Sequence, residues 1–250
     1  MNIAEKPFPL RHVKAGMAAQ VMTTLSSAPP PALFVTGTDT NVGKTVAAAW
    51  LVQLLAARYW KPIQTGAISD SDTATVQQLA GISPAQAGHR LLPPRYLYDD
   101  PVSPHEAARR QGAVIALEAL QMPSHPDPAD RRGGSLVIEG AGGLLVPLNR
   151  DAYIIDLIAQ LAVPVVLVTR GTLGTLNHTL LSLQALRARG LGILGLIVVG
   201  SYQPAENRQA LKLYGGVPIL AELPWLDPLT PQALAAIPPL IPPARWQAHG

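Results

Sequence analysis

A short glycine-containing stretch near the start of the chain constrains the fold more than any other feature. Residues 37–45 read GTDTNVGKT, directly after the apolar run ALFVT at 32–36, and a stretch rich in Ala, Val and Leu follows at 44–57. The first flank is typical of a buried strand and the second of a helix. A turn in this context presents backbone N–H groups at a helix N-terminus, where they bind phosphate. The sequence therefore predicts an α/β fold built around a phosphate-binding loop.

Two side chains of the stretch have roles in such a loop. Lys44 neutralises phosphate charge, and the hydroxyl of Thr45 is a ligand for Mg²⁺. Gly37 lies one residue further from Gly43 than in the common pattern, and Thr38 stands where a glycine is usual, which indicates a subtype of the loop. A strand-turn-helix corner with an incidental lysine is the alternative, and the strand and helix flanks argue against it.

The same alternation of strand and helix recurs along the chain. Apolar, β-branched runs at 135–139, 163–169 and 193–199 predict strands, and residues 177–189 predict a helix. Such an order favours a parallel sheet covered by helices. We therefore expect an α/β fold, a single-domain P-loop NTPase with a mostly parallel sheet flanked by helices.

Proline and glycine suggest where the domain ends. Residues 1–31 end in a proline run and are expected to form a flexible N-terminal extension, with an organellar transit peptide as the alternative. Residues 32–228 are the expected P-loop domain, and 124–134 a surface loop. The Pro-rich tail at 229–250 is expected to wrap the surface without regular structure.

Composition excludes several classes of protein. Hydrophobic residues make up 48% and charged residues 14% of 250, yet no apolar run reaches membrane-spanning length, so no membrane partner is expected. A net charge of +3 without a block of like charges argues against nucleic acid. Cysteine is absent, which excludes disulfides and thiol chemistry and fits a reducing compartment. The expected location is cytoplasmic.

Three further motifs join the loop: YWKPIQTG at 59–66, EGAGGLLVP at 139–147 and LGTLNH at 173–178. Together with the loop they make the chain resemble dethiobiotin synthetase, from about residue 33 to residue 226. The resemblance implies an ATP-dependent ligase that closes the ureido ring of 7,8-diaminononanoate with CO2 or bicarbonate, releasing ADP and phosphate through a carbamate and a carbamic-phosphoric anhydride. It also implies Mg²⁺ and a homodimer whose partner closes the substrate site.

The resemblance also implies roles for charged residues. Lys61 and Lys44 are the expected catalytic lysines, and Mg²⁺ is expected on Thr45, Asp72 and Glu139. The position of Glu139 also indicates a ligand-binding role. It is expected to end an apolar strand at the carboxyl edge of the sheet, where ligands bind in such folds. Asp70 remains the rival of Asp72 for the metal.

The remaining site residues follow from motif position. Gly140, Gly142 and Gly143 are expected to let the backbone approach a ligand, in preference to serving only a tight turn. The expected nucleotide-binding set is Thr40, Asn41, Val42, Gly43, Lys44, Thr45, Val46, Asp72, Glu139, Gly140, Ala141, Gly142, Val199, Gly200, Pro224, Trp225 and Leu226, and the expected substrate-binding set is Thr65, Gly174, Thr175 and Asn177.

The segment expected to contact the nucleotide base departs from the family pattern. The family commonly places an asparagine that reads adenine after the strand at 193–199, whereas the nearest match here is Val199. Valine has no side-chain donor or acceptor, so we expect relaxed base preference, with CTP and other nucleoside triphosphates serving within about tenfold of ATP. The alternative is that Ser201 replaces the asparagine.

Three alternative functions are considered. A ParA- or MinD-like ATPase switch would carry an extra lysine early in the loop, where Thr38 and Asp39 stand. An amidoligase like cobyrinate a,c-diamide synthase would add a glutaminase domain with a cysteine nucleophile. A catalytically silent relative, retained for protein contacts, is the third.

Overall fold

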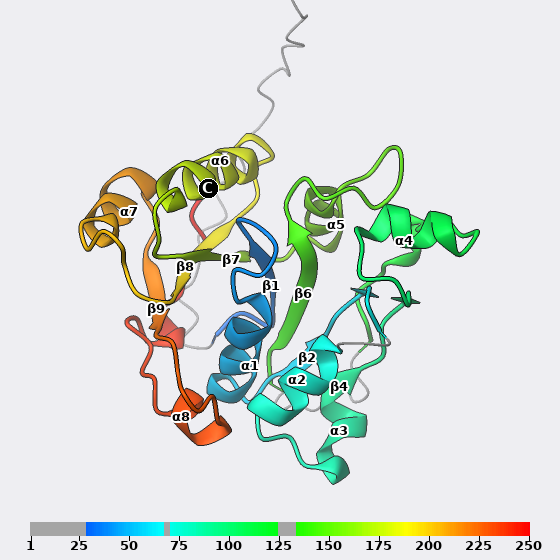
Figure 1. Ribbon diagram of the computed structural model, residues 1–250, viewed down its shortest axis with the longest axis horizontal. Coiled ribbons are helices and arrows are strands. Elements are labelled where there is room, and N and C mark those ends of the chain that lie inside the picture. The colour runs from blue at the N-terminus through cyan, green and yellow to red at the C-terminus, as the bar shows by residue number, and fades with distance from the viewer. Residues whose placement is uncertain (1–28, 68–70, 125–133) are drawn as a thin grey trace, which may run out of the picture.

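A parallel sheet forms the centre of the molecule in a computed structural model that describes residues 29–67, 71–124 and 134–250 (Figure 1). Within these ranges its order is β4-β2-β6-β1-β7-β8-β9, and every neighbouring pair is parallel. A separate parallel pair joins β3 and β5. The strands are β1 (Ala32–Gly37), β2 (Arg58–Trp60), β3 (Ile63–Gln64), β4 (Leu91–Leu92), β5 (Tyr96–Leu97), β6 (Leu136–Gly143), β7 (Val165–Arg170), β8 (Ile193–Val199) and β9 (Ile219–Leu223).

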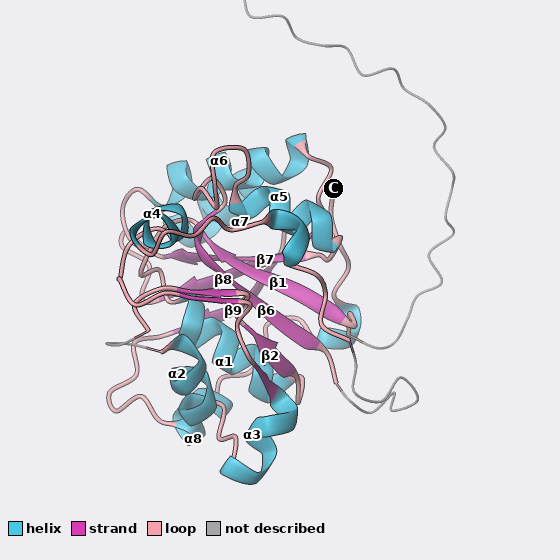
Figure 2. Ribbon diagram, turned by 90° about the vertical axis from the view of Figure 1, so that its right-hand side faces the viewer, coloured by secondary structure: helices cyan, strands magenta, loops and turns pink. Residues whose placement is uncertain are grey.

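Helices cover both faces of the sheet, which gives three layers (Figure 2). One face carries α1 (Lys44–Leu54), α2 (Asp72–Leu79), α3 (Pro84–Arg90) and α8 (Pro231–Ala235), and the other carries α4 (Pro104–Arg110), α5 (Ile154–Leu161), α6 (Thr175–Ala188) and α7 (Asn207–Gly215). The expected mostly parallel sheet flanked by helices is confirmed. None of the helices in the described ranges combines the length and apolar character needed to cross a bilayer.

The central strand β1 contributes side chains to two hydrophobic cores, one on each face of the sheet. Leu33 and Val35 belong to the core under α1, and Phe34 belongs to the core on the opposite face, as the period of two along a strand requires. Helix α1 is buried over most of its length, with Trp50 only 1% exposed, so it packs tightly on the sheet. This packing fixes the loop between β1 and α1 at the carboxyl edge of the sheet.

The expected strand at 193–199 has the bounds of β8, whereas other boundaries differ, and β7 begins two residues later than expected. Strand β6 runs through the glycines to Gly143, so the expectation that Glu139 ends its strand is wrong. Glycines lack a side chain but keep the N–H and C=O groups that pair with β1. Helix α1 ends at Leu54, and helix α6 begins at Thr175, earlier than expected.

The expectation of an irregular tail is also wrong. The tail contains helix α8 and a 3₁₀ turn, Pro243–Arg245. Leu234 and Trp246 are buried in the core under α1, and Trp50 donates to the Ile237 carbonyl at 3.0 Å. Apolar side chains spaced between the prolines therefore hold the tail against the domain. Residues 1–28 and most of the loop expected at 124–134 lie outside the described residues.

Candidate active site at the carboxyl end of the sheet

The phosphate loop connects β1 to α1 in the predicted place. Gly43 precedes the helix with φ of 93°, a left-handed conformation that favours glycine, and a Cβ there would lie 2.9 Å from Val199 Cγ1. Lys44 donates to the main-chain carbonyl of Asp39 at 3.0 Å, so its ammonium lies over the loop. Arg170, at the end of β7, donates to the Asn41 carbonyl from the other side.

A cluster of charged and hydroxyl groups lies beside the loop. The Thr45 hydroxyl is 2.5 Å from Asp72 Oδ1 and 3.0 Å from Glu139 Oε1. Lys61 Nζ pairs with Asp72 and, at 3.1 Å, with Glu139. Lys61 and Glu139 are 5% and 1% exposed. Residues from α1, α2 and β6 thus meet Lys61, which directly follows β2, at one point.

Tyr59 was not predicted from the sequence. Its hydroxyl donates to Glu139 Oε2 at 2.9 Å, and its side chain is fully buried. The signal was present, because residues two apart in an extended segment point to the same face. Tyr59 precedes Lys61 by two positions, and both reach Glu139. Arg170 was missed as well, since a single basic residue at a strand end has no distinctive spacing.

The electrostatics distinguish the two lysines. Burial lowers the pKa of Lys61, but attraction to Glu139 and Asp72 outweighs it, so the pKa lies above its ordinary value. The pKa of Lys44 is lowered, mainly by burial, which its attraction to Glu139 does not offset. Burial raises the pKa of Asp72, and Lys61 more than reverses this, leaving it below the ordinary range. Of the two lysines, Lys44 is therefore the one whose loss of hydration the neighbouring carboxylates do not offset.

The oxygen donors of the cluster suit a magnesium ion. Two carboxylates and one hydroxyl are hard ligands, and their small number leaves coordination positions for phosphate oxygens and water, which Mg²⁺ normally retains. Among the described residues no three His, Asp or Glu side chains gather into a site that could hold a metal without such added ligands. The cluster fits an ion that arrives with a nucleotide. The rival Asp70 lies outside the described residues.

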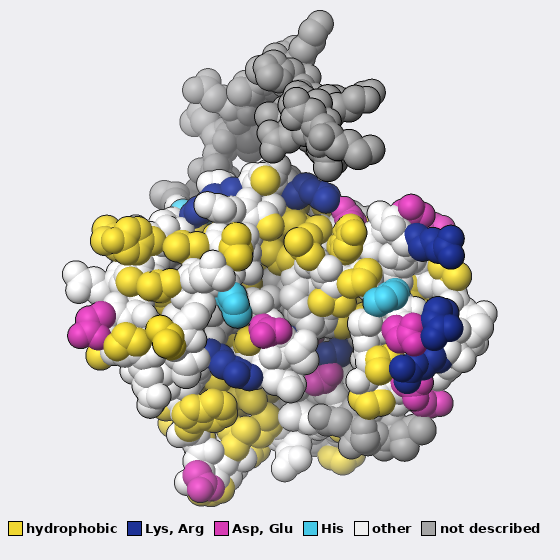
Figure 3. All heavy atoms as spheres, turned by 45° about the horizontal axis from the view of Figure 1, so that its top comes forward, with side chains coloured by type: hydrophobic (Ala, Val, Ile, Leu, Met, Phe, Trp, Pro, Cys, Tyr) yellow, Lys and Arg dark blue, Asp and Glu magenta, His cyan; other side chains and the backbone are white. Residues whose placement is uncertain are grey.

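The cluster opens into a cavity of about 360 Å³. A second cavity of about 460 Å³ adjoins it and shares Thr65 and Gly142 with it. Figure 3 looks onto a face on which charged side chains of both signs lie between two histidines. The predicted site residues that line the first cavity are Thr40, Asn41, Gly43, Lys44, Thr45, Val46, Lys61, Thr65, Asp72, Glu139, Ala141 and Gly142.

Two residues predicted to contact the nucleotide, Val42 and Gly140, also have a packing role, and their predicted contacts stay predictions. Val42 is 3% exposed and belongs to the core under α1. A Cβ on Gly140 would lie 2.8 Å from Phe34 Cε1, so the lack of a side chain there is explained by the core on the opposite face of the sheet. Gly142 does line the cavity, and its predicted ligand approach stays a prediction.

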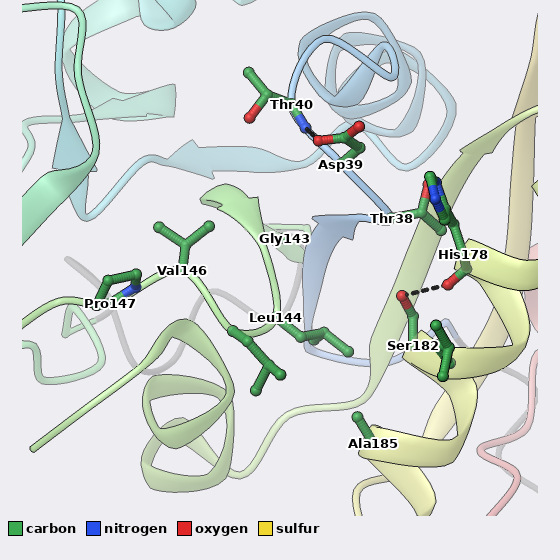
Figure 4. A pocket seen from close by; sticks show the side chains of 12 residues that line it. Thr38, Asp39, Thr40, Gly143, Leu144, Val146, Pro147, His178, Ser182 and Ala185 are labelled. Atoms are coloured by element: carbon green, nitrogen blue, oxygen red, sulfur yellow. Dashed lines mark hydrogen bonds between the residues drawn. The ribbon is translucent and has the colours of Figure 1, made fainter.

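A third cavity, of about 500 Å³, lies between the phosphate loop and α6 (Figure 4). His178 and Ser182 line it from α6, and Asp39 lines it from the loop. The predicted substrate residues Gly174 and Asn177 are exposed at the start of α6. Thr175 is buried, its hydroxyl lies 2.9 Å from that of Thr169, and its main-chain N–H donates to the Thr172 carbonyl at 3.1 Å.

The base-side residues lie outside the 360 Å³ cavity and are mostly apolar. Val199 is 5% exposed and faces Gly43. Gly200 has φ of 83°, and the indole of Trp225 packs so closely over it that a Cβ would lie 2.8 Å from Nε1. Trp225 is nevertheless 74% exposed. Pro224 and Leu226 flank this open aromatic face in the sequence.

Comparison with known proteins assigns the family. Residues 31–233 match a family described as an AAA domain. The ATP-dependent dethiobiotin synthetase of Paramagnetospirillum magneticum is 46% identical over 83% of this chain and 94% of its own. The chain belongs to the dethiobiotin synthetase family. The enzyme of that name from Afipia carboxidovorans is also 46% identical, over 82% of this chain and 92% of its own.

Solved structures resemble the chain only distantly. A ParA family ATPase from Chlorobium tepidum covers 84% of this chain and 91% of its own at 13% identity, with a TM-score of 0.46. That likeness is too low to bear on function. Membership of the dethiobiotin synthetase family, shown by relatives 46% identical, sets aside the ParA- or MinD-like switch and the amidoligase.

Proposed function

We propose that this enzyme is a Mg²⁺- and ATP-dependent dethiobiotin synthetase of biotin biosynthesis. It would join CO2 to the two amines of 7,8-diaminononanoate and release ADP and phosphate. The observation that carries the proposal is the buried meeting of Lys61, Asp72, Glu139 and Thr45 beside a phosphate loop, in a chain 46% identical to named synthetases. A binding protein has no need of a second buried lysine at this point.

The reaction makes and breaks bonds only on the substrates. One amine and CO2 give a carbamate and a proton; a carbamate oxygen attacks the γ-phosphorus and ADP leaves. The second amine then attacks the carbamoyl carbon, phosphate leaves and the ring closes with loss of a proton. Lys61 would neutralise charge on the carbamate and the transferring phosphoryl group, and Lys44 would neutralise the β- and γ-phosphates. Neither lysine becomes covalently bonded.

Thr45, Asp72 and Glu139 are proposed to hold Mg²⁺. The ion would supply charge neutralisation on the phosphate oxygens. Before the nucleotide arrives, Lys61 occupies the two carboxylates. The lysine therefore partly neutralises the buried carboxylate of Glu139 and the partly exposed carboxylate of Asp72.

The adjoining cavity of about 460 Å³ is proposed to bind the diamine, with Thr65 shared between the two cavities. We propose a homodimer in which the partner's Gly174, Thr175 and Asn177 close this site. Exposed leucines support a buried interface here, because Leu173 is 88% and Leu181 57% exposed. Sedimentation showing a fully active monomer would contradict it.

The nucleotide site is proposed to discriminate only weakly between bases. Val199 offers no polar group and is turned toward Gly43, whereas the open indole of Trp225 can stack on any base. ATP is the expected co-substrate, and other triphosphates including CTP would serve. The proposed P-loop domain is residues 32–228, and residues 229–250 pack against it through Leu234 and Trp246. Without cysteine the chain fits the cytoplasm, which is its proposed location.

Incubation of the purified protein with 7,8-diaminononanoate, bicarbonate, Mg²⁺ and ATP tests the function. We expect dethiobiotin, identified by its mass, and no product when the diamine or the triphosphate is omitted. A folded protein that binds ATP but forms no dethiobiotin would instead support the silent relative.

A further inference from the structure

Three side-chain donors, two of them from the segment 59–61, reach the carboxylate of Glu139. Lys61 Nζ and the Thr45 hydroxyl lie 3.1 Å and 3.0 Å from Oε1. The Tyr59 hydroxyl lies 2.9 Å from the other oxygen, Oε2. The two oxygens of one buried carboxylate therefore have separate partners.

The three donors differ in their freedom to leave. Lys61 and Thr45 line the 360 Å³ cavity, where the proposed function gives both of them to the nucleotide and its metal ion. Tyr59 is fully buried in the core under α1 and α2 and does not line the cavity. When the site fills, its hydroxyl is the donor that stays on Glu139.

We propose that Tyr59 is a positioning residue, whose hydroxyl holds Glu139 Oε2 so that Oε1 faces the cavity when the magnesium nucleotide binds. This proposal rests on one part of the proposed function, the role of Glu139 as a ligand of the metal ion. A ligand carboxylate whose outer oxygen has lost its donor is free to rotate. Loss of such an outer partner typically weakens metal binding by about ten- to a hundredfold.

Tyr59→Phe tests the proposal, because it removes the hydroxyl and leaves the ring to fill the core. The probe is a non-hydrolysable ATP analogue titrated by calorimetry, once with Mg²⁺ and once with EDTA. We expect affinity with Mg²⁺ to fall about tenfold or more and affinity in EDTA to stay within twofold of wild type. Tyr98→Phe is the matched control, since Tyr98 is 4% exposed and its hydroxyl has no hydrogen-bond partner among the described residues.

A double-mutant cycle with Glu139→Gln shows whether Tyr59 acts through that carboxylate. In the Glu139→Gln background, Tyr59→Phe should cause little further loss of magnesium-dependent affinity. Unchanged affinity with Mg²⁺, equal losses with and without Mg²⁺, or full additivity in the cycle would each overturn the proposal. These are binding measurements, so a failure to form dethiobiotin refutes the proposed function without changing their outcome.

The wild-type protein provides a test that needs no variant to fold. A hydrogen-bonded, buried tyrosine hydroxyl exchanges its proton slowly enough to be sought by NMR. Persistence of the Tyr59 hydroxyl signal when the magnesium analogue binds supports the proposal. Its loss on binding, while the protein stays folded, overturns it.

Discussion

The phosphate side and the base side of the proposed nucleotide site are built in opposite ways. On the phosphate side, Lys61 and Glu139 are buried and linked by ion pairs and hydrogen bonds. On the base side, Val199 has no polar atom in its side chain, and Trp225 is 74% exposed. Buried charged groups interact strongly with their partners and only in a defined geometry, because the local dielectric constant is low. An exposed aromatic ring, by contrast, can stack on any nucleotide base. The phosphate side should therefore decide turnover, and the base side should discriminate little.

The largest expected effect comes from Lys61. Lys61→Ala should lower kcat by a factor on the order of 10² or more while the fold is kept, because a fixed ammonium near the transferring phosphoryl group is lost. Steady-state kinetics and a thermal melt measure the two quantities. Lys212→Ala, at an exposed lysine of α7, is the control. Wild-type turnover in Lys61→Ala would remove this residue from the site.

The carboxylates come next. Asp72→Asn and Glu139→Gln should each weaken magnesium-dependent nucleotide binding by about tenfold or more, because each removes a charged oxygen ligand. Titration of the ATP analogue at several Mg²⁺ concentrations measures this. Asp70→Asn is the comparison, and a larger effect there than at residue 72 would show that the metal ligand was assigned to the wrong aspartate.

A smaller and uniform effect is expected on the base side. Trp225→Ala should weaken binding of ATP, CTP, GTP and UTP by about fivefold each, since stacking contributes roughly 1 kcal/mol or more whatever the base. Tyr214→Ala, at an exposed aromatic residue on α7, is the control. A loss confined to ATP would mean that Trp225 reads adenine rather than offering a general surface.

The smallest difference should appear between the triphosphates themselves. In the wild-type enzyme, kcat/KM for CTP, GTP and UTP should lie within about tenfold of ATP, about 1.4 kcal/mol. The reason is that the phosphates have most of the contacts and Val199 none to a base edge. A preference for ATP of about a hundredfold over every other triphosphate would contradict weak discrimination on the base side and favour Ser201 as the residue that recognises adenine.

The sequence predicted the parts of the molecule that follow local rules. Strand β8 and the loop at Gly43 and Lys44 follow from apolar runs and glycine at a left-handed position. The extension of β6 to Gly143 could not be seen, because glycine is uncommon in strands and the pairing with β1 is a tertiary effect. The prediction of an irregular tail was wrong. It relied on the prolines, whereas the apolar residues between them pack into the core of the domain.

The site divides in the same way. Lys61 and Glu139 were found because their motifs carry them, and the structure brings them within 3.1 Å. Tyr59 was missed because a tyrosine in an apolar strand is expected to be core, and only the neighbouring strand shows that its hydroxyl reaches a carboxylate. Gly140 was assigned to the ligand, which stays a prediction, and Phe34 on the other face gives a second reason why no side chain stands there.

One labelling experiment tests the central claim most directly. The purified enzyme is given 7,8-diaminononanoate, ¹³C-bicarbonate, Mg²⁺ and ATP, and both phosphate release and product mass are followed. We predict dethiobiotin that carries the label in its ureido carbon, with one phosphate released for each ring closed. Phosphate released without labelled dethiobiotin, or no turnover by a folded protein that binds ATP, would contradict it.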